Sequence, residues 1–264
     1  MNNKITKQIA LIFLSLLLLS NMLVAIENSA TNISKLIDIA GKQRMLSQRI
    51  AKDYLYVGKR VATSKAKKQL TLSLAEFLKI HNELGSLITD PEIHNLLDFV
   101  SLSLDDLKSV SSKKFNLDNA QLILDLSESM LEGNQYIVDS LKEKYKIKNF
   151  DLLEKTAKQR MLSQRIAKYY IAYQSGIKDE NTVNSMKDTV KQFSENLTLL
   201  LKNKNKMVKV DNKLKEIEKL WKIVHKFYNN IEKGGLPLIV FNTTDKITKK
   251  MDEVTKIYIN LNNH

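Results

Sequence analysis

The sequence has no cysteine, which excludes disulfides, thiolate metal sites and cysteine nucleophiles. Only seven glycines and two prolines occur in 264 residues, whereas a sheet protein of this size would need many more tight turns. The four histidines are scattered, and none follows another at a spacing of three or four residues, which argues against a haem or zinc site. These absences predict an all-helical protein without a metal or other cofactor.

One long apolar run lies at the N-terminus. Lys4 and Lys7 precede the run, which covers residues 9–25, and Glu27 follows it. This pattern is typical of a secretory signal peptide or of a signal anchor, and its length of about 17 residues is short for a membrane-spanning helix. Cleavage would leave a chain starting near Ile26. With or without cleavage, we expect the rest of the chain in the periplasm, with membrane contact only through an uncleaved N-terminal segment.

The formal net charge of +13 is unevenly distributed. Residues 31–146 carry a net charge of +2, whereas residues 147–264 carry +10. A solvated, lysine-rich surface is one explanation, and a patch for an anionic partner such as lipid headgroups is the other. Nucleic acid is not an expected partner, because we expect export and the basic half has no recognisable nucleic-acid-binding motif.

An internal repeat organises the chain. The eleven residues 42–52, with the sequence KQRMLSQRIAK, recur unchanged as residues 158–168, 116 positions later. We call each copy the box. Weaker matches follow at the same spacing, for example Phe77 with Phe193. The repeat divides the chain into a signal segment (1–25), module one (26–146) and module two (147–264).

Each module is predicted to contain four helices, near 31–62, 65–88, 91–112 and 118–146 in module one and near 150–175, 181–204, 208–232 and 237–261 in module two. Asp90 before Pro91 is a good helix start, and Gly234 to Pro237 marks the last turn. We therefore expect two tandem up-down four-helix bundles. The joint over residues 144–150 has no glycine or proline, which favours stacking end to end, although Asn149 or Asp151 could cap a fresh helix.

The first helix of each module sorts into three faces at 100° per residue. The core face of module one holds Leu36, Ile39, Gln43, Leu46, Ile50 and Tyr54, and its solvent face holds Asp38, Lys42, Arg49 and Lys52. We call the third face the seam. It holds Ile37, Gly41, Arg44, Gln48, Ala51 and Leu55 in module one, and Leu153, Ala157, Arg160, Gln164, Ala167 and Ile171 in module two.

The seam combines small residues, which permit close helix packing, with one arginine. A two-fold partner would bring two copies of Arg44 together, and two such charges about 4 Å apart repel by about 4 kcal/mol at an effective dielectric near 20. A small oxyanion between them would replace that repulsion with charge-assisted hydrogen bonds. In the alternative, Arg44 and Arg160 form salt bridges within the chain or lie in solvent.

The box, together with the preceding residues 38–41, resembles the first helix of the NarX/PilJ-type sensor domain. That domain occurs in nitrate/nitrite sensor kinases and in type IV pilus chemotaxis receptors. The resemblance implies a periplasmic four-helix bundle that binds nitrate or nitrite at a dimer interface, through the box arginine and backbone near the preceding glycine. With the seam glutamines, the candidate ligand-binding residues are Gly41, Arg44 and Gln48 in module one and Ala157, Arg160 and Gln164 in module two.

Three departures from the family pattern bear on function. Ala157 replaces the glycine and could block an anion, so module two is the poorer candidate. The box sequence Met-Leu-Ser-Gln is closer to the pilus-receptor version, from which a nitrate ligand does not follow. The second membrane helix, relay segment and output domain of those receptors are not found in this sequence, so we expect a homodimer or a separate membrane receptor or kinase as partner.

Two functions are consistent with these features. The first is an exported sensory or ligand-binding module that binds a small oxyanion and signals through a separate partner. The second is a structural or adaptor protein of the cell envelope or of the type IV pilus machinery that binds no ligand. An enzyme is not expected, because the sequence shows no nucleophile–base set, metal cluster or glycine-rich phosphate loop.

Overall fold

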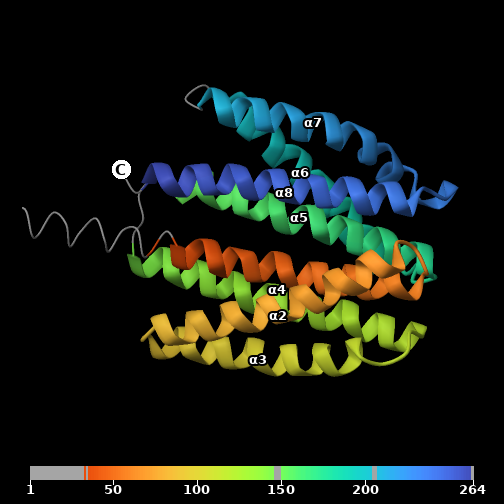
Figure 1. Cartoon of the computed structure of the whole chain (residues 1–264), viewed down its shortest axis with the longest axis horizontal. Coiled ribbons are helices and arrows are strands. Elements are labelled where there is room, and N and C mark those ends of the chain that lie inside the picture. Colours follow the sequence, from red (N-terminus) through yellow and green to blue (C-terminus); the bar gives the residue numbers. More distant parts are fainter. Residues whose placement is uncertain (1–32, 34, 146–149, 204–206, 263–264) are drawn as a thin grey trace, which may run out of the picture.

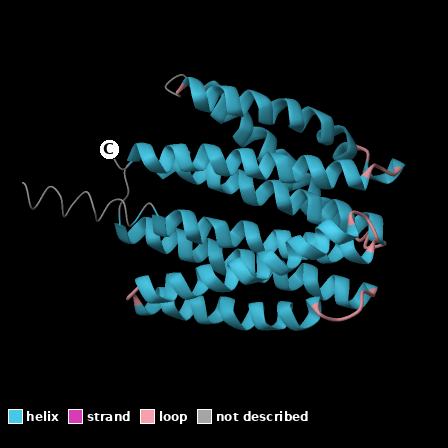
Figure 2. Ribbon diagram, in the orientation of Figure 1, coloured by secondary structure: helices cyan, strands magenta, loops and turns pink. Residues whose placement is uncertain are grey.

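The structure, a computed structural model, describes residues 33, 35–145, 150–203 and 207–262, and this part of the chain is helical without any strand (Figure 2). The first helix covers residues 35–58. It is followed by α2 (Thr63–Leu87), α3 (Pro91–Ser111), α4 (Leu117–Tyr145), α5 (Phe150–Ser175), α6 (Glu180–Lys202), α7 (Val208–Asn229), the short η1 (Ile231–Lys233) and α8 (Pro237–Asn262). The apolar run over residues 9–25 lies outside the described residues. Among the helices that are described, none combines the length and hydropathy needed to cross a membrane.

Two predicted helix boundaries are confirmed by their local geometry. The Asp90 side chain accepts hydrogen bonds from the backbone N–H groups of Glu92 and Ile93, and Pro91 occupies the first turn, where an N–H would have no helical partner. Gly234 has a φ of 76°, in the left-handed region that favours glycine, just before α8 begins at Pro237.

The helices form two bundles, as predicted for an all-α protein with two four-helix modules. The first helix and α2–α4 belong to module one, and α5–α8 belong to module two. All run roughly along the long axis of the molecule (Figure 1). The α2–α3 pair lies on one side and the α6–α7 pair on the other, while the first helix, α4, α5 and α8 lie between them (Figure 1).

The arrangement of the bundles differs from the expected end-to-end stacking, because the modules lie side by side. The Arg165 guanidinium in α5 contacts the Glu128 carboxylate in α4 at 2.6 Å. In one continuous helix these residues, 37 positions apart, would be separated by about 55 Å. The chain therefore reverses direction between α4 and α5. The residues that would cap a fresh helix there include Asn149, which lies outside the described residues.

The side-by-side packing explains how the faces of the first helix are used. The predicted core face is buried, and so is every seam residue of both modules. The predicted solvent face is partly wrong, because Lys52 is completely buried and Lys42 and Arg49 are only partly exposed. The reason is that α8 of module two covers a face that a single bundle would leave in water, as the ion pair of 2.8 Å between Lys52 and Asp245 indicates.

Candidate functional site

The seams of the two modules face each other within the chain. A Cβ atom built on Gly41 would lie 3.4 Å from the Ala157 Cβ, 3.4 Å from Arg44 Nη2 and 3.7 Å from Arg160 Nη2. Both guanidinium groups therefore approach the same small space beside Gly41, and both arginines are completely buried. The partner helix that the sequence led us to seek in a second molecule is supplied by the second box of the same chain.

Arg160 is neutralised by two carboxylates. Its Nη1 donates to Asp252 Oδ1 at 2.7 Å, and its Nη2 donates to Asp38 Oδ1 at 2.6 Å. Asp252 lies in α8 of the same module, whereas Asp38 lies in the first helix of module one. Burial acts against the charged form, but the two carboxylates outweigh it and raise the pKa of Arg160. For this arginine, the alternative of salt bridges within the chain holds.

Arg44, with the same local sequence, has no such partner. Its Nη1 donates to the amide oxygen of Gln135, while Nε and Nη2 have no hydrogen-bond partner among the described residues. Burial lowers the pKa of Arg44 to about 10; Glu154 opposes this effect, and the charge of Arg160 adds to it. Arg44 therefore stays a cation at neutral pH, inside the protein and with two unused donors.

The difference between the arginines comes from the positions around the boxes. At the repeat spacing of 116, Asp252 corresponds to Tyr136, and Asp38 corresponds to Glu154. Tyr136 is 54% exposed and carries no charge to offer Arg44. Glu154 lies 3.9 Å from Lys142 and makes no contact with Arg44 that would match the Asp38 contact with Arg160. Arg44 therefore has no carboxylate partner in the described part of the chain, because Tyr136 stands at the position of Asp252 and the Glu154 carboxylate lies near Lys142 instead.

The seam glutamines use their donors elsewhere. Gln48 Nε2 donates to the Ser127 carbonyl at 2.8 Å, and Gln164 Nε2 donates to Thr248 Oγ1 at 2.6 Å. The Oε1 atoms of both glutamines are buried without a partner in the described part of the chain. Because these free atoms are acceptors, the glutamines add no donor for an anion. Ala157 contributes its methyl group to the packing opposite Gly41.

The ends of the boxes are joined by reciprocal ion pairs between the modules. Glu128 in α4 binds both Arg165 and Lys168 of the second box, and Asp245 in α8 binds Lys52 of the first. Burial lowers the pKa of Lys168 to about 8, with Glu128 opposing the shift. Each module therefore holds the box of the other through a carboxylate on its last helix.

Sequence reasoning missed the residues that distinguish the two arginines. The spacing along the first helix predicts Asp38 in solvent, because a single helix carries no information about its neighbour in module two. Gln135 and Asp252 belong to no motif. The one available signal was a position-by-position comparison of the two repeats, which sets Tyr136 against Asp252.

The fold and the paired boxes define a protein of two tandem helical bundles. The chain belongs to the family described as the N-terminal part of type IV pili methyl-accepting chemotaxis transducers, whose model matches residues 26–97 and 152–240, one segment in each module. This is a family of sensory, non-catalytic domains. The matched family is the pilus-transducer one of the two that the box resembles. The match does not show that the chain is a domain of the nitrate-sensor type. No curated protein and no solved structure matches the chain significantly.

Proposed function

We propose that the chain is the exported sensory module of a chemotaxis transducer system, and that one small oxyanion binds between its two boxes. Nitrate and nitrite are the first candidates. The observation that carries the proposal is the completely buried Arg44 guanidinium, which has two donor nitrogens without a partner among the described residues and faces a second guanidinium across Gly41. Arg160, already held by two carboxylates, needs no anion of its own.

The physical argument rests on the state of Arg44 without ligand. A buried donor that lacks a partner costs about 1–3 kcal/mol, and a charged one costs more. A planar oxyanion accepts two parallel hydrogen bonds from the Nε and Nη2 edge of a guanidinium, and these bonds are strong because both partners are charged. An anion at this position would also screen Arg44 from Arg160. The buried seam favours a small ligand.

Location and partner complete the proposal. The apolar run over residues 9–25 after Lys4 and Lys7 supports export to the periplasm. A ligand that enters a closed seam has to displace the two box helices relative to each other, and a membrane receptor or kinase that contacts both modules would sense this displacement. We expect such a partner, or a second copy of the chain, to receive the signal.

Thermal unfolding of the full chain tests the proposal. Nitrate or nitrite, added against chloride at equal ionic strength, should raise the Tm with concentration. At a ligand concentration of 100 times Kd, the expected stabilisation is about 2.7 kcal/mol. Arg44→Met should abolish the rise. If no small oxyanion raises the Tm of the unmodified chain, the oxyanion site is refuted, and the structural or adaptor role becomes the better account.

Gly41→Ala offers a sharper variant, because the new methyl group would meet its neighbours at 3.4 Å or more and should not disturb packing. It would, however, occupy the space that Arg44 and Arg160 share, so the response to oxyanions should weaken at least about tenfold. Gly85→Ala in α2 is the matched control, because a methyl group there meets nothing within 4 Å. The control should keep the full response. Equal responses in both variants would place the anion elsewhere.

A further inference from the structure

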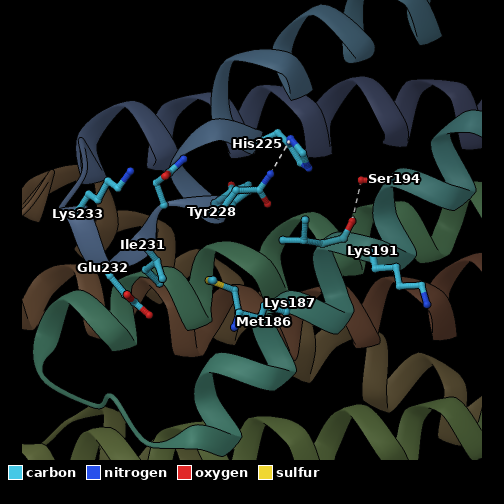
Figure 3. Close-up of a pocket in the computed structure, with 12 residues that line it drawn as sticks. Met186, Lys187, Lys191, Ser194, His225, Tyr228, Ile231, Glu232 and Lys233 are labelled. Carbon is cyan, nitrogen blue, oxygen red and sulfur yellow. Dashed lines mark hydrogen bonds between the residues drawn. The ribbon is translucent and has the colours of Figure 1, made fainter.

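A second candidate site lies in module two, in a cleft of about 510 Å³ between α6 and α7 beside η1. Its floor is apolar and buried, formed by Met186, Val190, Tyr228 and Ile231. Figure 3 shows side chains from all three elements around the same space, with Lys233 at one end and Lys191 at the other. The volume falls within the range of roughly 300–1,000 Å³ that is common for small-molecule sites.

The rim of the cleft is positively charged. Lys187, Lys191 and Lys233 line it, and none of them forms an ion pair within the described part of the chain. By contrast, Lys215 and Lys222 on α7 each contact a carboxylate, at 2.6 and 2.8 Å. Among the described residues that line the cleft, Glu232 carries the one carboxylate. Three free ammonium groups against one carboxylate leave a positive rim above an apolar floor.

We propose that this cleft binds a small amphipathic anion, a carboxylate or phosphate attached to an aromatic ring or a short apolar chain. A neutral apolar molecule would cover Met186, Tyr228 and Ile231 but would leave the lysines unmatched. A bare inorganic ion would match the lysines but would leave the apolar floor in water. Only a molecule with both parts satisfies the two halves of the cleft. The site is separate from the seam and does not depend on the proposed oxyanion.

The chain contains its own reporter for this site. Trp221, the single tryptophan, has its ring centroid 5.3 Å from that of His225 and 5.7 Å from that of Tyr228. His225 and Tyr228 both line the cleft. A ligand that packs on these side chains changes the surroundings of the indole, so the tryptophan fluorescence of the full chain should change on binding.

The test is a fluorescence titration of the full chain with benzoate and with phenyl phosphate at constant ionic strength. Both should give a saturable change. Benzamide, which lacks the charge, and acetate, which lacks the ring, should bind at least about tenfold more weakly. The absence of a saturable change with benzoate and phenyl phosphate would overturn the proposal, and so would binding of benzamide as tight as that of benzoate.

Matched double variants separate the cleft from the general basic surface. Lys187→Gln with Lys191→Gln should weaken benzoate binding at least about tenfold. Lys219→Gln with Lys222→Gln removes the same charge from exposed positions of α7 outside the cleft and should leave binding unchanged. Equal weakening by both pairs would reduce the effect to net charge and overturn the site.

Three further arms complete the design. Ser194→Phe should abolish benzoate binding without a change in charge, because the partly exposed Ser194 lines the cleft and its replacement would fill it. Retained binding in this variant would contradict the assignment.

Arg44→Met should leave benzoate binding intact, which distinguishes this site from the seam. Binding of the chain to phosphatidylglycerol vesicles without binding of benzoate would assign the basic surface to a membrane instead and overturn the small-molecule site.

Discussion

The first and second boxes have identical sequences over eleven residues, yet their arginines lie in opposite electrostatic environments. Arg160 is clamped between Asp38 and Asp252, whereas Arg44 meets one neutral amide from Gln135. The local sequence determines the helix and the direction of each side chain. Neighbouring helices, which the repeat preserves only weakly, determine whether the charge is matched. A duplicated motif is therefore not a duplicated site.

Fusion of the modules in one chain is what permits this difference. An interface between two identical subunits with two-fold symmetry gives both copies of a residue the same surroundings. Within one chain the two sides can diverge, as Tyr136 and Asp252 have done at equivalent positions of α4 and α8. Arg160 then serves as a structural cation, whereas two nitrogen atoms of Arg44 keep no hydrogen-bond partner among the described residues.

The largest expected effect tests this division of roles through stability. Arg160→Met should destabilise the chain by about 3 kcal/mol, because it leaves Asp38 and Asp252 as partly buried carboxylates without their partner. Arg44→Met should be neutral or stabilising, because it removes an unmatched buried charge and keeps the volume. Urea unfolding of both variants measures the difference. Equal losses would mean that Arg44 is as structural as Arg160.

The next prediction exchanges the environments. Tyr136→Asp should place a carboxylate where Asp252 lies in the other module, pair it with Arg44 and weaken oxyanion binding at least about tenfold, or about 1.4 kcal/mol. Asp252→Asn should remove one of the two carboxylates that pair with Arg160. A second oxyanion per chain should then bind at Arg160, more weakly than the first binds at Arg44. Calorimetric titration with nitrate gives affinity and stoichiometry together. Unchanged binding in Tyr136→Asp would show that the charge around Arg44 does not control the site.

The smallest effect concerns Asp53, whose counterpart in module two is Tyr169. Burial raises the pKa of Asp53 from 3.8 to about 7, with Lys52 opposing the shift. Because the folded chain holds this proton more tightly than the unfolded chain, the stabilisation is complete below pH 4 and is lost as the pH rises toward 7. Asp53→Asn should remove this part of the pH dependence. It should stabilise the chain at pH 8 by only about 1 kcal/mol, because the gain from removing a buried charge is largely offset by the loss of the 3.3 Å ion pair between Lys52 and Asp53, while Lys52 keeps its contact with Asp245.

Unfolding free energies between pH 4 and 8 check this prediction. Asp106→Asn, an exposed substitution on α3, is the matched control and should leave the pH dependence unchanged. A wild-type stability that does not fall from pH 4 to 7 would contradict the assignment to Asp53, and so would an equal fall in wild type, Asp53→Asn and Asp106→Asn.

Much of the fold could be predicted from the sequence, because helix faces and helix ends are local properties. The N-cap at Asp90, the turn at Gly234 and the burial of the seam all follow from spacing and residue type. The side-by-side arrangement does not, because the joint near residues 144–150 carries no turn signal. The buried state of Lys52 and the clamp on Arg160 depend on helices almost 200 and about 120 positions away, and no local pattern contains that information.

The reversal between α4 and α5 also changes how the seam responds to dilution. A seam formed by two separate subunits would open as the protein becomes scarce, since association depends on protomer concentration. Here one polypeptide carries both halves, so each box meets the other at the effective concentration of a tethered pair, on the millimolar scale for short linkers. A seam assembled in this way stays closed at a few copies per cell. The fraction of chains with the proposed oxyanion in the seam would then depend on the concentration of the oxyanion and not on that of the protein.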